Sequence, residues 1–412
     1  MLRVANGLWT TRRGSASRQR DKTRPKPDSP LLQPSTETTM PKRQYVDFHI
    51  IQTVPPANLN RDDQGNPKDA VFGGVRRARV SSQAWKRAAR RAFDEKLPEA
   101  DQSTRTKRIA GQLAERVALR TGVDPEAAAR IAAALLEPLG IKAGKKAGNT
   151  AYLLFFGYRQ LDEIVDLIAD QAQDLAGLDD DQLKEATKKL AVADRLKSGH
   201  PIGVALFGRM VADIASLNVD AATQVAHAIS THACNLESDY YTAVDDENEA
   251  DESGAGMLGN IGFNAATLYR YATVGVHQLV DNLGSVDAAI DAVGKFAQAF
   301  ALSVPTGHIN SFAHRTRPSL VAVVVRNDQP VNLVTAFESP VKETNGIAAA
   351  SARRLAEEYT RSTEQWGDQP AFFAACHAFE DDVLAKAFGA NQPFNTLLSG
   401  LNETLTTSWA VR

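Results

Sequence analysis

The chain has 412 residues, 43% of them hydrophobic, and its 47 basic and 49 acidic side chains give a net charge of −2. This length and apolar content allow a sizeable core, divided into two or three lobes. The two cysteines, Cys234 and Cys376, form no CxxC pair, which excludes a disulfide framework and a structural zinc site and fits a reducing cytoplasm. The longest apolar runs are too short to cross a bilayer, so no membrane partner is expected.

Residues 1–43 are expected to be a disordered basic extension outside the fold. Up to residue 39 the chain is rich in Arg, Ser, Thr and Pro and poor in large aliphatic side chains. Three interpretations fit this composition: an organellar transit peptide, a misassigned start with Met40 as the true initiator, or a basic arm with non-specific affinity for RNA.

The first element of the fold is a predicted strand over residues 45–54, with Val46, Phe48 and Ile50 on one side. A loop follows, and residues 70–93 then carry seven Arg and Lys side chains and no acid. A local positive element in an otherwise balanced chain predicts that a polyanion, most naturally nucleic acid, docks at one place.

A helix is predicted to begin at Ser81 or Ser82 and to run to about Lys96. Trp85, Ala88, Ala89, Ala92 and Phe93 form its buried face. Free N–H groups at the helix start and cations along its side suit backbone phosphates. The alternative is an ordinary amphipathic helix with a solvated basic face, but the lack of interleaved Glu argues against it. The predicted polar face consists of Gln83, Lys86, Arg87, Arg90 and Asp94.

The remaining pattern indicates an α+β fold. Residues 103–197 are Ala-rich and helical in character, as expected of an inserted helical lobe. Strands, helices and the insertion alternate in an order that favours a split ferredoxin-like (RRM-like) sheet with helices on one face. The later elements are predicted as a strand over 202–210, a helix over 220–232, a strand over 264–276, a helix over 286–302 and a strand over 320–326.

Several motifs, in order along the chain, resemble the CasC family, the backbone subunits that hold the guide RNA in the type I-E CRISPR complex Cascade. The resemblance runs from about Gln44 to the C-terminus. Because that family is prokaryotic, the misassigned start is the preferred interpretation of the extension. The motifs are LNRDD, KDAVFGG and RRARVSSQAWKRAARR between residues 59 and 91, IGVALFGRM at 202–210, AHAISTHACNLESDYYTAVDD at 226–246 and LYRYATVGVHQLVDNLG at 268–284.

The resemblance implies an RRM-like palm over 44–100 and 200–412, helical fingers over 101–199 and a protruding thumb hairpin over 240–262. It also implies a non-catalytic subunit that stacks head-to-tail along the spacer of the crRNA and presents bases for pairing with target DNA. The implied partners are crRNA, target double-stranded DNA as an R-loop, further copies of the chain, and the other Cascade subunits: the large subunit, the small subunit, the crRNA-processing endonuclease and the guide 5′-end-binding subunit.

The resemblance places Met210 against flipped or neighbouring bases, with a core methionine as the alternative. An apolar hairpin tip made of Met257, Leu258 and Ile261 is expected to wedge between bases or to dock on a neighbouring subunit. The expected contacts to the RNA backbone are Arg61, Lys68, Ser81, Gln83, Lys86, Arg87 and Arg90. Possible DNA contacts are Lys142, Lys145 and Lys146, for which solvated surface is the alternative.

A competing hypothesis is a metal-dependent endoribonuclease of a CRISPR system. Asp62 and Asp63 follow the first strand and have the chemistry to position a metal-activated water. They are equally suited to pairing with Arg61 or Arg76, and the matching LNRDD motif implies no cleavage role, so we expect neither a metal nor a cofactor. A third interpretation, a generic RNA chaperone, predicts binding without a preference for length or register. His308 and His314 lack a partnered base for general acid–base catalysis.

Overall fold

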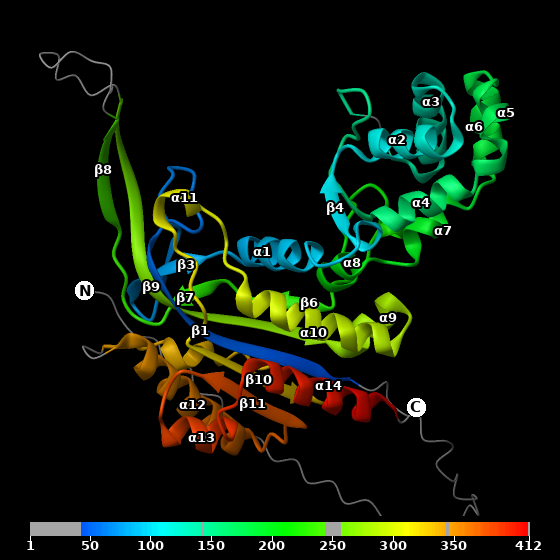
Figure 1. Ribbon diagram of the computed structural model, residues 1–412. Coiled ribbons are helices and arrows are strands. Elements are labelled where there is room, and N and C mark those ends of the chain that lie inside the picture. Colours follow the sequence, from blue (N-terminus) through cyan, green and yellow to red (C-terminus); the bar gives the residue numbers. More distant parts are fainter. Residues whose placement is uncertain (1–42, 142–143, 244–256, 343–345, 411–412) are drawn as a thin grey trace, which may run out of the picture. The chain divides into compact units, whose positions relative to one another are not determined.

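The computed structural model describes residues 43–410 except 142–143, 244–256 and 343–345 (Figure 1). Residues 1–42 of the basic extension, Lys142 and residues 244–256 of the predicted thumb hairpin therefore lie outside the described residues. Among the helices that are described, none is both long enough and apolar enough to cross a membrane.

The centre of the fold is an antiparallel sheet whose strands follow the order β11-β10-β1-β9-β7-β3-β2, with β6 and β8 also paired to β9. The register of β1 against β9 shifts between Val54 and Ala57, where Pro55 and Pro56 have no N–H to donate. The strands are β1 (Tyr45–Ala57), β2 (Asp69–Phe72), β3 (Val75–Val80), β6 (Thr223–Val225), β7 (Ala228–Ser230), β8 (Glu237–Ala243), β9 (Met257–Gly275), β10 (Leu320–Arg326) and β11 (Phe372–His377).

Helices cover both faces of this sheet (Figure 1). Val46, Phe48 and Ile50 of β1 share one core with α1 (Ser82–Asp94) and α10 (Val286–Leu302). The expectation of helices on one face only was wrong, because alternate residues of β1 and β10 are also buried on the opposite face. The first face also carries α9 (Val276–Leu283) and α14 (Phe394–Ala410), and the second carries α12 (Ile347–Trp366) and α13 (Asp382–Phe388).

Residues 103–217 contribute to a separate hydrophobic core, which includes Leu113, Ile131 and Leu161. The helical character expected of this region is present, but the sequence did not indicate its two-stranded sheet. The elements are β4 (Ser103–Thr106), α2 (Ile109–Thr121), α3 (Pro125–Leu136), β5 (Leu154–Gly157), α4 (Tyr158–Asp166), α5 (Ala172–Ala176), α6 (Asp180–Lys188) and α7 (Val192–Lys197).

Two element types were predicted wrongly. The strand expected over 202–210 is the helix α8 (Ile202–Phe207), and the helix expected over 220–232 is replaced by the short strands β6 and β7. A short apolar run does not distinguish a buried strand from a buried helix by periodicity, and pairing with β9 decided the second case. In contrast, the predicted helix over 286–302 and strand over 320–326 match α10 and β10.

Strand β9 is 19 residues long and extends beyond the central sheet to pair with β8. Its C-terminal part, residues 264–275, pairs with β1 on one side and with the short strands β6 and β7 on the other, whereas residues 257–263 pair only with β8 among the described strands. The result is a β8–β9 hairpin rooted in the middle of the sheet (Figure 1).

Candidate nucleic-acid interface

Two buried or half-buried polar side chains, Asn58 and Asn60, fix the loop between β1 and β2 against its neighbours. Asn60 Oδ1 accepts a 2.9 Å hydrogen bond from the backbone N of Ser81, at the start of α1. Asn58 Nδ2 donates to the carbonyl oxygens of Gly65 and Gly262, each at 2.9 Å. The loop over 58–68 is therefore held between the N-terminus of α1 and the base of the β8–β9 hairpin.

Helix α1 begins after Ser81, as predicted. The Ser81 backbone is extended, and its side chain accepts a hydrogen bond from the backbone N of Ala84 at 3.4 Å. Because Ser81 is buried, its hydroxyl serves the helix cap. The expected polar face is present: Gln83 and Arg87 are exposed, and Lys86 is half-buried. Burial lowers the pKa of Lys86.

Arg90 belongs to the same face but is engaged within the protein. Its guanidinium lies 5.3 Å from the ring centre of Phe155 in β5, and Nη1 lies 3.9 Å from Asp94 Oδ2. Burial is the main cause that lowers the pKa of Arg90 and raises that of Asp94 to about 6. Arg90 thus joins α1 to the helical region, and it is less available for RNA than Arg87.

The three arginines of strand β3 have local partners. Arg77 is fully buried and donates to the carbonyl oxygens of Ser230 and Phe337 at 2.9 and 2.8 Å. Arg76 pairs with Asp69 at 2.8 Å, and Arg79 donates to the carbonyl oxygen of the same residue at 2.9 Å. Arg76 and Arg79 therefore stabilise the β2–β3 hairpin, and Arg77 joins β3 to β7 and to Phe337. The basic side chains of α1 are left as the basic surface.

Arg61 and Lys68 lie on the two arms of the loop over 58–68, where Arg61 is bridged to Pro67. Arg61 is exposed, and its Nη1 lies 3.4 Å from His308 Nε2, while Lys68 is half-buried. The carboxylate of Asp62 is turned inward to the loop, where Oδ1 accepts hydrogen bonds from the backbone N atoms of Gln64 and Asn66 at 2.9 and 2.8 Å. Asp63 is exposed. In the part of the chain that the structure covers, no group of three His, Cys, Asp or Glu residues is placed to hold a metal.

Met210 is exposed to 85%, so it is not the core methionine that the sequence left as an alternative. The residue before it, Arg209, is buried and donates to the carbonyl oxygens of Leu217 and Leu196 at 2.6 and 2.5 Å. Burial lowers the pKa of Arg209 to about 10. Gly208 has φ +73°, and a Cβ there would meet the Val219 oxygen at 2.7 Å. A fixed loop therefore displays an apolar side chain to solvent.

A model of the CT1975-like protein family matches residues 46–399. The chain belongs to the CT1975-like protein family. No curated protein matches it.

Two solved chains are similar to this CT1975-like protein over most of its length. A chain of a "CRISPR RNA-guided surveillance complex, pre-nicking" is 34% identical with a TM-score of 0.78, covering 88% of this chain and 100% of that one. A chain of a "CRISPR RNA-guided surveillance complex" is 29% identical with a TM-score of 0.68, covering 87% and 99%. The resemblance to Cascade backbone proteins of the CasC type is thereby confirmed.

The β8–β9 hairpin of this CT1975-like chain carries aromatic side chains that the sequence analysis missed. Tyr240 and Tyr241 in β8 are exposed to 65% and 43%, and Tyr240 lies opposite Asn260. Of the expected apolar tip, Ile261 is half-buried, while Met257 and Leu258 are placed by their backbone pairing with β8. Residues 237–242 of β8 are all exposed, so no alternation of buried and exposed positions marks the tyrosines.

The lysines expected to meet DNA are placed in part. Lys145 and Lys146 are exposed in a turn closed by the hydrogen bond from Gly144 N to the Asn149 oxygen, at 2.8 Å. Lys142 lies outside the described residues. This turn contacts α2, since Gly111 N donates to the Gly148 oxygen at 3.0 Å, and it is separate from the surface formed by α1 and the 58–68 loop.

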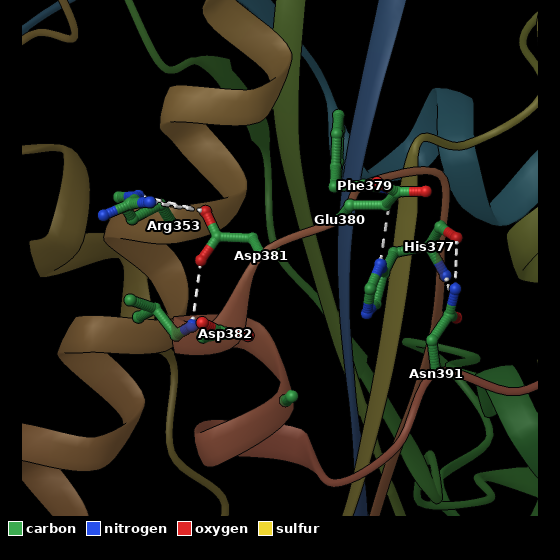
Figure 2. A pocket seen from close by; sticks show the side chains of 9 residues that line it. Arg353, His377, Phe379, Glu380, Asp381, Asp382 and Asn391 are labelled. Atoms are coloured by element: carbon green, nitrogen blue, oxygen red, sulfur yellow. Dashed lines mark hydrogen bonds and ion pairs between the residues drawn. The ribbon is translucent and has the colours of Figure 1, made fainter.

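A depression on the opposite side of the CT1975-like fold is lined by polar and apolar residues, several of which contact one another (Figure 2). Asp381 pairs with Arg353 at 3.0 Å and accepts from the backbone N of Val383 at 2.9 Å. The amide of Asn391 bridges the backbone N and O of His377 at 3.0 and 2.9 Å. These contacts hold the segment between β11 and α13 in place, and the depression is no part of the α1 surface.

Proposed function

We propose that the chain is a non-catalytic backbone subunit of a type I-E Cascade complex, and that copies of it polymerise along the crRNA spacer. The observation that carries this proposal is the surface of α1 and the 58–68 loop, where Arg61, Gln83 and Arg87 are exposed beside Lys86. The likeness to chains of CRISPR RNA-guided surveillance complexes supports it.

The fold supports a ferredoxin-like palm within this proposal. Strands β10, β1, β9 and β7 are consecutive neighbours in the sheet, and α1 and α10 pack on the same face. In chain order these are the four strands and two helices of a βαββαβ unit. We assign the fingers to residues 101–199 and the thumb to the β8–β9 hairpin within 240–262.

The exposed groups on α1 suit a ligand whose sequence varies. Cations and an amide along one helix face contact phosphates and sugar hydroxyls, which are the same at every nucleotide. Met210 offers an apolar contact for an unstacked base, and the hairpin tyrosines offer a second one. Bases that remain free are presented to the target DNA, so base pairing supplies the specificity.

The proposed partners follow from this role. They are the crRNA, target double-stranded DNA held as an R-loop, neighbouring copies, and the large, small, guide-processing and guide 5′-end-binding subunits of Cascade. Lys145 and Lys146 remain the proposed DNA contacts because they are exposed and away from α1. Antiviral interference with DNA is the biological outcome of such an assembly.

The decisive experiment is to purify the chain with its co-expressed partners, extract the bound nucleic acid and sequence it. We expect one size class of RNA with repeat-derived ends around variable spacers. Heterogeneous cellular RNA would support a generic RNA binder instead, and a preparation free of RNA would remove the basis of the proposal.

The endoribonuclease is the second candidate, and the geometry of the loop bears on it. One carboxylate oxygen of Asp62 accepts hydrogen bonds from two backbone N–H groups of its own turn, as expected of a residue that stabilises the loop conformation. We therefore expect the purified complex not to cleave complementary RNA with Mg²⁺ or Mn²⁺. Cleavage that is lost in both Asp62→Ala and Asp63→Ala, in variants that still bind crRNA, would establish the enzyme.

A further inference from the structure

The segment over 305–317, PTGHINSFAHRTR, is positively charged and lies beside the candidate interface. It contains two arginines and two histidines and no acid. Arg315 and Arg317 are exposed, and neither forms an ion pair with any residue that the structure describes. Unpaired cations concentrated in one segment of a chain with nearly zero net charge create a local positive potential, which favours binding of an anionic partner.

The segment is held rigidly at both ends. Thr316 Oγ1 donates to the Thr53 oxygen at 2.7 Å, and the amide of Gln52 donates to the Thr316 oxygen at 2.9 Å. His314 is fully buried, and its Nε2 hydrogen-bonds to the oxygen of Pro305 at 2.9 Å, which closes the segment on itself. The backbone that carries Arg315 and Arg317 is therefore already ordered, so that only their side chains lose conformational freedom when a ligand binds.

The same segment is pressed against the 58–68 loop. A Cβ on Gly307 would lie 2.4 Å from the oxygen of Asn58, so the two backbones are in close contact. His308 Nε2 lies 3.4 Å from Arg61 Nη1, and Phe312 lies 6.0 Å from the ring of Phe263 at the base of the hairpin. The segment thus extends the Arg61 surface from α1 towards the hairpin.

Two residues of the segment have a left-handed backbone conformation, which costs conformational energy in any residue other than glycine. His308 and Ala313, which flank the short helix α11 (Ile309–Phe312), have φ values of +49° and +45°. Among the described residues they are the only non-glycine positions with positive φ. Such strain is retained when the surrounding structure over-determines it, and it concentrates at functional sites.

We propose that residues 305–317 form a second RNA-backbone-binding element, in which Arg315 and Arg317 contact phosphates of the strand that also passes Arg61 and α1. The inference rests on the proposed function, because it names a further part of the same RNA-binding surface. RNA is favoured over a neighbouring protein copy because the segment is continuous with Arg61 and its exposed charge is all of one sign.

The test uses the full chain, the Arg315→Ala/Arg317→Ala double variant and labelled oligouridylates, one short enough for a single copy and one long enough for several. Loss of two phosphate contacts lowers the slope of log affinity against log salt by about 1.4, at roughly 0.7 per contact for a single strand. The Arg315→Lys/Arg317→Lys variant keeps both charges and should retain the slope. As a control, Arg353→Ala/Lys386→Ala removes two cations from α12 and α13.

The outcomes separate this inference from the proposed function. A lower slope on the short RNA in the double variant, but not in the control, supports it. If Lys86→Ala lowers the slope and the double variant does not, the inference is wrong and the proposed function stands. If neither variant changes RNA binding, both are wrong. A loss confined to the long RNA would make the segment a contact between copies and would overturn the proposal.

Discussion

The guanidinium of Arg270 lies 3.8 Å from the ring centre of Trp85 and 4.6 Å from that of Phe300. Arg270 belongs to β9 and Trp85 to the buried face of α1, so a cation–π contact joins the strand of the hairpin to the proposed RNA-binding helix. Nη1 of the same arginine donates to Gln52 Oε1 at 2.5 Å. Burial lowers the pKa of Arg270 to about 9, so it remains charged at neutral pH.

Replacing Trp85 with alanine removes this contact and leaves a cavity under α1. We expect Trp85→Ala to lower the free energy of unfolding by about 3–5 kcal/mol, measured by urea denaturation. RNA affinity should fall in the same variant, since α1 loses its support. Trp85→Phe keeps an aromatic face near Arg270 and should retain most of the stability. Wild-type stability in the alanine variant would show that the contact does not hold the helix.

Lys86 is predicted to contact phosphate. In Lys86→Ala we expect weaker RNA binding on every sequence tested, and a salt slope reduced by about 0.7, measured by fluorescence anisotropy at several salt concentrations. Lys386→Ala on α13 removes the same charge from the opposite side of the sheet and should change neither quantity. An affinity loss on some sequences only would indicate base readout.

Because the side chain of Met210 is exposed, a substitution there tests a role in binding without disturbing the core. Met210→Ala should change the free energy of unfolding by less than about 0.5 kcal/mol, as is usual for an exposed position. Contact with an unstacked base predicts instead a change in the fluorescence of 2-aminopurine placed along the bound RNA. Unchanged fluorescence at every position would remove Met210 from the interface.

His49 should give the stability a measurable dependence on pH. Burial lowers the pKa of this fully buried histidine to about 3, from 6.5. The stabilisation is therefore present above pH 6.5 and is lost as the pH falls, because only the unfolded chain binds the proton. Between pH 7 and 5 this loss amounts to about 2 kcal/mol.

The measurement compares the wild-type chain with His49→Asn, which does not titrate. Denaturation at pH 7 and pH 5 should show the wild type losing about 2 kcal/mol relative to the variant. The comparison is needed because Asp47, whose pKa burial raises to about 6, contributes the opposite trend: its stabilisation is lost as the pH rises through 6. Equal pH dependence in the two proteins would mean that His49 is protonated in the folded state.

Two adjacent glycines in the β2–β3 turn offer a matched pair of substitutions. Both have positive φ, +60° at Gly73 and +78° at Gly74, so alanine is strained at either position. A Cβ on Gly73 would in addition lie 1.6 Å from the oxygen of Glu338, whereas nothing lies within 4 Å of one on Gly74. We expect Gly74→Ala to cost about 1 kcal/mol and Gly73→Ala clearly more, measured by thermal unfolding. Equal costs would show that the turn moves away from Glu338 freely.

Local patterns account for the elements that the sequence predicted well. The start of α1 at Ser81, its Trp85 and Phe93 face, and the bounds of α10 and β10 follow from capping and hydrophobic periodicity. These signals are contained within a few turns or one strand, so they need no knowledge of distant partners. The basic stretch was recognised by composition for the same reason.

The partners of individual side chains were decided by the tertiary structure. The sequence analysis singled out Lys86, Arg87 and Arg90 among the seven basic residues of 70–93 as RNA contacts. The structure distinguishes them further: Arg90 stacks on Phe155 and Arg87 stays exposed, while Arg77 is buried against the 337–338 backbone. The exposure of Met210 and the contact of 305–317 with the 58–68 loop likewise depend on segments far apart in the chain.

The amino-acid sequence by itself determined the basic helix, the alternating core strands and the family, because each depends on patterns among residues that are close together in the sequence. Only the tertiary structure decided which cations remain exposed and that β6 and β7 are strands. The physical reason is that long-range packing and pairing, here mainly with β9, outweigh local preference wherever a short segment is compatible with more than one conformation.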